Sequence, residues 1–184
     1  MPNWCWNVLT IEGKEVVVEE FIEFVKNENG EDEQLFDFNT ILPSPDKYEK
    51  KYNNIFELWV EQGHFPKDVD MELPDFLKGE YTATRIDWCD GNWGTKWNAC
   101  NVDLHLTKPG LAIYHFDTAW SPPEPVVIAL GESFPNLTFH LKFMEPGMLF
   151  RGQLLMKNGE ILNRYTEQIP DEDIEKYISG ELEF

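Results

Sequence analysis

The segment NACNVDLHLTKPGLAIYHFDTAW (residues 98–120) predicts two antiparallel strands near the middle of the chain. Apolar and polar residues alternate on both sides of a Lys-Pro-Gly tripeptide at 108–110, and such alternation is typical of half-buried strands. Proline and glycine favour a tight turn at the tripeptide. The two strands, 98–107 and 111–120, are therefore expected to pair as a hairpin.

A helix is predicted directly after this hairpin. Ser121 is expected at its N-cap, Pro122 at its first position and Glu124 three residues after the serine, which is the pattern of a capping box. An apolar stripe follows at helical spacing, formed by Val126, Val127, Leu130 and Phe134. Replacement of Ser121 by alanine is therefore expected to cost about 1 kcal/mol of stability.

Two further strands and another helix complete the core. Residues 4–11 (WCWNVLTI) and 136–144 (NLTFHLKFM) alternate and predict strands, and residues 15–27 carry the apolar stripe of an amphipathic helix. The element order is then βαββαβ, which is the order of ferredoxin-like folds. We therefore expect an α+β fold with an antiparallel sheet and two helices on one of its faces.

A long insertion separates the first helix from the second core strand, at about residues 38–96. Residues 35–45 are expected to be extended, because prolines close this stretch. Aromatic and apolar residues recur at helical spacing in 46–62 and predict a second helix, whereas 63–84 shows no clear period. The apolar residues of the insertion are too few for a separate core, so we expect a single domain over residues 1–184.

A C-terminal extension is predicted at residues 148–180. Residues 148–165 form a β-hairpin that turns at Asn158-Gly159, and this dipeptide is a strong signal for a two-residue hairpin turn. A short helix is expected at 170–178, because acidic residues follow Pro170 in its first turn.

Four motifs occur in a fixed order along the chain. They are MPNWCWNVLTIEG (1–13), NWGTKWNA (92–99), FDTAWSPPEP (116–125) and FPNLTFHLKFMEPG (134–147). Together they resemble the YubB-type ferredoxin-like domain family of phage and plasmid proteins. The resemblance extends over nearly the whole chain and is weakest at residues 28–85. It implies a ferredoxin-like fold and an origin in mobile genetic elements or their bacterial hosts, and it implies no particular activity.

The charge of the chain is strongly acidic and unevenly distributed. Its 34 acidic and 15 basic residues give a net charge of −19, and the acidic excess lies at the two ends, in 1–37 and 166–184. Direct binding of nucleic acid is not expected, because contacts to the phosphate backbone require clustered lysine and arginine. A macromolecular partner is instead expected to be a protein with a basic surface.

Composition and cysteine usage indicate a globular cytoplasmic protein. Hydrophobic residues make up 42% of the chain, which is enough to form a core. The sequence contains no apolar run near the roughly 18 residues that span a bilayer, and its start has no export signal, so no membrane association is expected. The three cysteines form no C-x-x-C motif, which favours a reducing compartment.

Three tryptophans are predicted to gather at one end of the sheet. Trp93 and Trp97 precede the second core strand and Trp120 follows the third, and the hairpin places these strand ends side by side. Lys96 and Asp117 are expected beside them. The group either packs under the insertion, with Asp117 accepting hydrogen bonds from turn N–H groups, or lines a ligand pocket with aromatic walls.

The sheet face that is turned away from the helices holds a second set of candidate residues. If Leu9 and Ile11 face the helices, Trp4, Trp6 and Val8 face away. We expect the two indoles to pack under the C-terminal hairpin. Polar residues of neighbouring strands share that face, namely Asp103, His105, His140 and Lys142. The phase of His115 is ambiguous.

No catalytic or metal-binding motif accompanies these groups. The sequence shows no nucleophile elbow, triad order, phosphate loop or zinc-ligand spacing, and no cofactor is predicted. We therefore expect a non-enzymatic, cytosolic accessory or interaction protein of a phage, plasmid or other mobile element.

Two alternatives remain open at this point. The first is a small-molecule-binding protein or enzyme whose site is the cluster of Trp93, Trp97, Asp117 and Trp120. The second is an acidic inhibitor that imitates nucleic acid and occupies a basic host protein. Its contact surface would be the glutamates of the first helix, namely Glu15, Glu19, Glu20 and Glu23.

Overall fold

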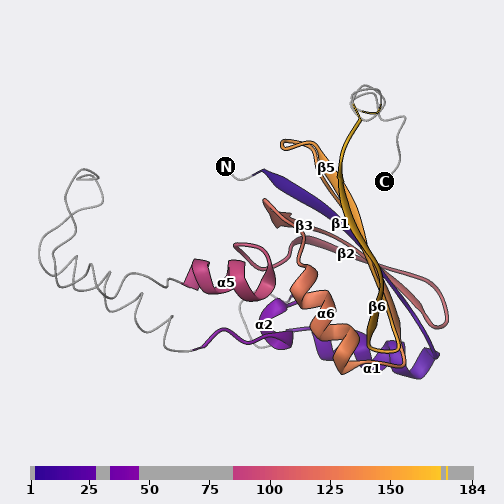
Figure 1. Ribbon diagram of the computed structural model, residues 1–184. Coiled ribbons are helices and arrows are strands. Elements are labelled where there is room, and N and C mark those ends of the chain that lie inside the picture. Colours follow the sequence, from indigo (N-terminus) through magenta and orange to yellow (C-terminus); the bar gives the residue numbers. More distant parts are fainter. Residues whose placement is uncertain (1–2, 28–33, 46–84, 171–172, 174–184) are drawn as a thin grey trace, which may run out of the picture.

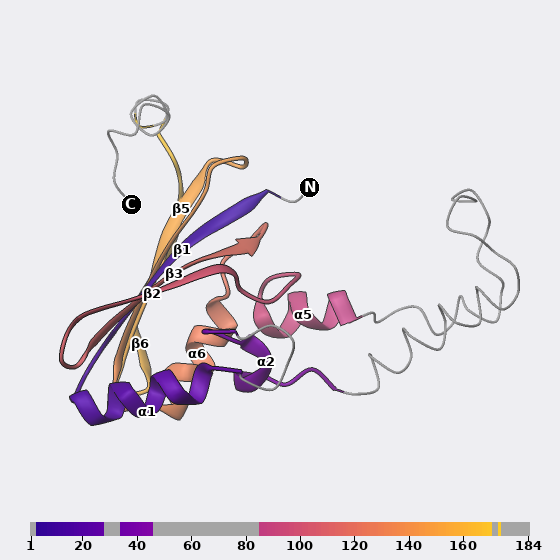
Figure 2. The same cartoon turned by 180° about the vertical axis from the view of Figure 1, so that it is seen from behind.

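The computed structural model describes residues 3–27, 34–45, 85–170 and Asp173 (Figure 1). Six strands form one antiparallel sheet: β1 (Trp4–Glu12), β2 (Cys100–Lys108), β3 (Leu111–Ala119), β4 (Thr138–Glu145), β5 (Phe150–Lys157) and β6 (Glu160–Gln168). The described helices are α1 (Glu15–Val25), α2 (Phe38–Ile41), α5 (Arg85–Trp93) and α6 (Glu124–Ser133). These helices lie on one face of the sheet, as Figures 1 and 2 show from opposite sides.

The strand order confirms the predicted ferredoxin-like core. The sheet runs β2-β3-β1-β4-β5-β6, and its first four strands have the order expected for βαββαβ. The hairpin β5–β6 continues the sheet beyond β4. Its turn lies at Asn158 and Gly159, whose φ angles of 56° and 76° are the left-handed values that a two-residue turn between twisted strands requires.

The predicted facing of the strands is also confirmed. Odd-numbered residues of β1 are buried under the helices, and Leu9 and Ile11 are among them. Leu9 pairs with Leu141 of β4, and Leu141 pairs with Leu154 of β5, so three fully buried leucines cross the sheet in one row. Phe21 of α1 packs edge-on against the buried rings of Tyr114 and Phe139, which belong to β3 and β4. The core therefore lies between the sheet and the helix layer.

The described ends of the insertion take part in this core. Residues 35–45 were expected to be extended, but α2 forms within them because Asp37 caps it: the Asp37 carboxylate accepts a hydrogen bond from the Asn39 N–H at 2.8 Å. The same buried carboxylate accepts from the side-chain amides of Asn27 and Asn98, at 2.7 and 2.6 Å. Helix α5 was not predicted, and it carries the buried side chains Cys89 and Trp93.

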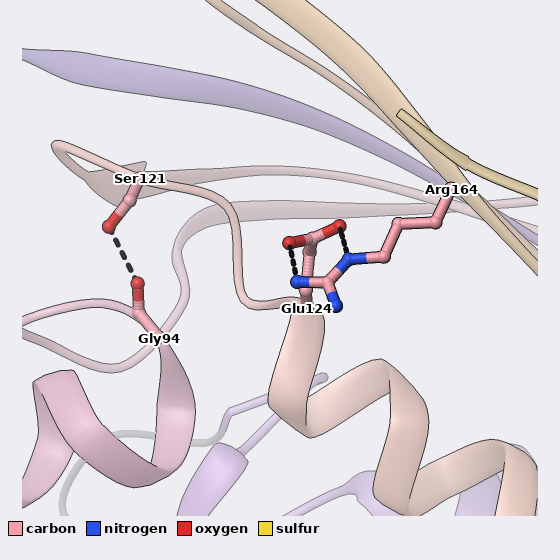
Figure 3. A network of polar contacts seen from close by, with 4 residues as sticks. All are labelled: Gly94, Ser121, Glu124 and Arg164. Atoms are coloured by element: carbon pink, nitrogen blue, oxygen red, sulfur yellow. Dashed lines mark hydrogen bonds and ion pairs between the residues drawn. The ribbon is translucent and has the colours of Figure 1, made fainter. Parts of the chain in front are cut away.

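The predicted capping box at the start of α6 is wrong. The helix begins at Glu124, its N-cap is Pro123, and no side chain caps it. Proline disfavours the helical conformation of the residue before it, and both Ser121 and Pro122 precede prolines. The Ser121 hydroxyl instead donates a hydrogen bond of 2.6 Å to the Gly94 carbonyl, while Glu124 forms a two-pronged contact with Arg164 of β6 (Figure 3).

Replacement of Ser121 by alanine is still expected to cost about 1 kcal/mol, because it removes one partly buried hydrogen bond. The lost hydrogen bond joins Ser121 to the loop at Gly94 and does not cap helix α6. Urea unfolding measures the loss, and amide hydrogen exchange locates it. Faster exchange near Gly94 and Thr95, with unchanged protection in α6, is the expected result. Loss of protection confined to the first turn of α6 would restore the capping interpretation.

Several predictions lie outside the described residues. They are the helix at 46–62, the aperiodic stretch at 63–84 and most of the helix at 170–178. A single domain over residues 1–184 therefore stays a prediction. None of the described helices has the length and the apolar composition needed to cross a membrane.

A candidate binding site at one end of the sheet

Three chain segments meet at the end of the sheet where β1 begins and β3 ends. Trp4 of β1 pairs with Ala119 of β3, and the Trp120 N–H donates a 2.9 Å hydrogen bond to the Asn3 carbonyl. The loop between α5 and β2 reaches the same place, since the Thr95 hydroxyl donates to the Ala119 carbonyl at 2.9 Å. Backbone and side-chain hydrogen bonds therefore join these segments at one end of the sheet.

Tryptophan side chains are unusually accessible here. Trp4 and Trp6 lie on the open face of β1, and the ring of Trp97 lies 6.3 Å from that of Trp4, measured between centroids. Trp6 and Trp97 are each 40% exposed. The Lys96 ammonium lies over the Trp97 ring, 5.4 Å from its centroid, in a cation–π contact. We call Trp4, Trp6 and Trp97 the tryptophan patch.

An open depression of about 440 Å³ adjoins this patch. It is lined by residues of α5, of the loop after it and of the segment that leads into α6, namely Ile86, Asp90, Gly94, Lys96, Trp120 and Ser121. The Trp120 side chain is 43% exposed. Lys96 connects the two features, because it lines the depression and also lies over Trp97. The patch and the depression therefore form one continuous candidate surface.

The backbone at Trp120 is held in a conformation that bulky residues seldom adopt. Its φ angle is +71°, in the left-handed region. Hydrogen bonds hold this residue and the next one in place. The Trp120 N–H donates to the Asn3 carbonyl. The Ser121 carbonyl accepts from the Thr118 hydroxyl at 2.7 Å, and the Ser121 hydroxyl donates to the Gly94 carbonyl. Such strain persists only where the surroundings enforce it, and it is common at functional sites. The Trp120 backbone is thus held in place by the hydrogen bonds of its neighbours.

Trp93 is not part of this surface. Only 1% of it is exposed, its indole N–H donates to the Leu42 carbonyl at 2.8 Å, and its ring meets those of Phe38 and Trp88 edge-on. Asp117 lies on the open face of β3 opposite Trp6, outside the depression. It accepts a hydrogen bond from the side chain of Asn101 at 2.8 Å, not from a turn N–H.

The open face of the sheet carries the predicted polar residues, and it includes His115. His105 lies 3.0 Å from Asp103, measured from its ring nitrogen to the carboxylate, and its ring meets that of His115 edge-on at 5.1 Å. The expectation that Trp4 and Trp6 pack under the C-terminal hairpin is wrong. Strand β5 pairs with β4 in the plane of the sheet, so the hairpin extends the face and does not cover it.

Burial disfavours the thiolate form of all three cysteines. Burial raises the pKa of the Cys5 thiol to about 12, and burial also raises the pKa of Cys89 and of Cys100. Thiolates are the nucleophilic and metal-binding form of cysteine, so these thiols are poorly suited to either role. Among the described residues, no three histidine, cysteine or acidic side chains are grouped closely enough to hold a metal ion.

The glutamates of α1 lie on the outside of the helix layer. Glu15, Glu19, Glu20 and Glu23 are all exposed. Glu23 pairs with Lys26 at 2.6 Å, one turn further along the chain. The acidic surface expected from the sequence is therefore present on this helix, and it is separate from the tryptophan patch.

Comparisons with known proteins agree with the fold. Residues 92–181 match the family model of the ferredoxin-like domain in Api92-like protein. A solved structure, that of protein Api92 from Yersinia pseudotuberculosis, is similar with a TM-score of 0.58 and 13% sequence identity. The similarity covers 92% of this chain and 99% of that one, and at this identity it shows the fold alone. A search of curated proteins finds no match.

Proposed function

We propose that this protein is a non-enzymatic, cytosolic accessory protein of a phage, plasmid or other mobile genetic element, and that it acts by binding another protein. The origin in a mobile element is supported by the resemblance of four sequence motifs to the YubB-type family. The binding role is supported by the surface at the end of the sheet.

The observation that carries the binding role is the exposure of the tryptophan patch. Trp6 and Trp97 each leave 40% of their surface in contact with water, and Trp4 joins them into one apolar area. Tryptophan is the residue most enriched at the energetic centres of protein interfaces, where its large ring is desolvated by the partner. Contiguous exposed apolar surface is also typical of interaction sites.

The partner is a protein with a basic surface. The net charge of −19 attracts positive proteins over distances comparable to the Debye length and repels nucleic acid. Complementary charge accelerates association, and it makes binding sensitive to salt. Burial raises the pKa of all three thiols, which disfavours the reactive thiolate and further supports a binding role over covalent catalysis.

The proposal is tested by co-purification from the natural bacterial host. The wild-type protein is compared with the double variant Trp6→Ser/Trp97→Ser and with Leu162→Ser, which removes a 56% exposed apolar residue from β6. We expect a partner that is retained by the wild type and by Leu162→Ser, is lost from the double variant, and elutes as the salt concentration rises. Equal melting temperatures of the three proteins establish that the fold is intact.

A partner that binds the double variant as tightly as the wild type would contradict the proposed surface. Charge reversal on α1, by Glu19→Lys and Glu20→Lys, then tests the acidic inhibitor. If the charge-reversal variants lose the partner and the tryptophan variants keep it, the contact is assigned to α1. Binding that is insensitive to salt and to all these changes would rule out both surfaces.

A further inference from the structure

We propose that the depression beside the tryptophan patch binds an arginine side chain of the partner protein. This inference rests on the proposed binding function and names the chemical group that the site recognises. The lining of the depression combines a carboxylate, an indole and an aliphatic side chain, contributed by Asp90, Trp120 and Ile86. Each matches one part of an arginine side chain.

The indole of Trp120 supplies a surface for the planar guanidinium group. Guanidinium groups stack on aromatic faces through cation–π attraction and dispersion, and tryptophan is the strongest aromatic partner. The chain already makes such a contact within the same surface, where the Lys96 ammonium lies 5.4 Å from the Trp97 centroid. Because hydrogen bonds fix the Trp120 backbone, less ordering of the site is needed on binding.

The carboxylate of Asp90 supplies the opposite charge. Asp90 is exposed on α5, and within the described part of the chain it forms no hydrogen bond or ion pair. A free carboxylate can accept two parallel N–H bonds from a guanidinium group, which is a geometry that an ammonium group cannot reproduce. The site is therefore expected to prefer arginine to lysine.

The remaining lining residues fit the rest of a bound segment. Ile86, which is 41% exposed, offers an apolar contact for the methylene stem of the arginine. Lys96 carries the same charge as the guanidinium group, but its ammonium group lies over the Trp97 ring, where it can donate a hydrogen bond to a backbone carbonyl of the bound segment. The depression is open to solvent on one side, as a site for a side chain that projects from another protein requires.

The test uses three small probes with the same blocked backbone: N-acetyl-arginine methylamide, the corresponding lysine compound and the corresponding citrulline compound. Citrulline has the shape of arginine without its charge. Binding to the full-length, ¹⁵N-labelled protein is followed by the NMR signal of the Trp120 indole N–H, which the Trp120→Phe variant assigns. The Asp90→Asn variant is the key comparison. Asp103→Asn, at an exposed aspartate of β2 outside the depression, is its matched control.

We expect saturable binding of the arginine probe, weaker binding of the lysine probe and none of the citrulline probe. Asp90→Asn is expected to weaken binding of the arginine probe about tenfold or more, because one charge-assisted pair is lost. Asp103→Asn is expected to leave the affinity for this probe unchanged. The inference is overturned if the arginine probe binds Asp90→Asn as tightly as the wild type. It is also overturned if the citrulline probe binds as tightly as the arginine probe, or if binding of the arginine probe to the wild type does not saturate.

Failure of this inference is distinguishable from failure of the proposed function. If the host partner still requires Trp6 and Trp97 but binds Asp90→Asn as tightly as the wild type, the binding function stands and the arginine site falls. If the arginine probe binds as expected but no host partner depends on the tryptophan patch, the proposed interface falls while the side-chain site stands.

Discussion

Alanine in place of Trp93 is expected to lower the free energy of unfolding by about 3–5 kcal/mol, the usual range for removing a large buried aromatic side chain. The ring is almost completely buried between Phe38 and Trp88, and its N–H is bonded to Leu42. Alanine would leave a cavity and one carbonyl without its donor. Urea unfolding followed by far-ultraviolet circular dichroism measures the loss without relying on tryptophan fluorescence.

The matched comparison is Trp120→Ala, because this tryptophan is 43% exposed. Its replacement is expected to destabilise the fold much less and to weaken binding of the arginine probe, whereas Trp93→Ala acts on stability. Equal losses of stability in the two variants would contradict the assignment of Trp93 to the core. Together, the two variants distinguish a tryptophan that stabilises the core from one that binds the probe, although the sequence predicts both at the same end of the sheet.

Replacement of Leu141 by alanine is expected to cost about 2–5 kcal/mol, as for other buried leucines. Leu141 lies in the centre of β4, is fully buried, and is flanked in the sheet by Leu9 and Leu154. The rigid sheet on which it lies can collapse only partly onto the space that the side chain leaves. The unfolding midpoint in urea should fall, while the slope of the transition stays the same.

The control for this prediction is the next residue on the same strand. Lys142 points to the opposite, open face and is exposed, so Lys142→Ala is expected to change stability by no more than about 0.5 kcal/mol. A neutral Leu141→Ala, or a costly Lys142→Ala, would mean that β4 faces the other way.

The alternating strands were predictable because their signal is local. In 136–144 every second residue is apolar, and a strand with one buried face imposes this period. The dipeptide Asn158-Gly159 likewise marks its own turn, since both residues tolerate the positive φ angles that are observed there. The order of these elements, with the short turn after residue 107, was then enough to give the ferredoxin-like topology.

Predictions from local sequence patterns were wrong where a side chain had more than one available hydrogen-bond partner. Ser121 fits a capping box by its spacing, but the adjoining prolines delay the helix and its hydroxyl bonds to Gly94, 27 residues away in sequence. Helices α2 and α5 are short and depend on distant contacts, such as those of Asp37 with Asn98. Propensity within a short window carries no information about such contacts.

The candidate site was predictable in part. The pairing of strand ends brought Lys96, Trp97 and Trp120 to the same end of the sheet, and the structure agrees. The period of β1 predicted that Trp4 and Trp6 share one face, but the hairpin expected to cover them extends the sheet instead.

Amino-acid order alone therefore specified the six strands, helices α1 and α6 and the faces that they bury, because each depends on the period of a few neighbouring residues. Folding in three dimensions settled which tryptophans are core and which are surface. Trp93 and Trp97 look equivalent in the chain, four residues apart. The end of α5 turns Trp93 into the helix layer, and the loop after it carries Trp97 to Trp4. Burial of that kind depends on packing between distant segments, which no local pattern encodes.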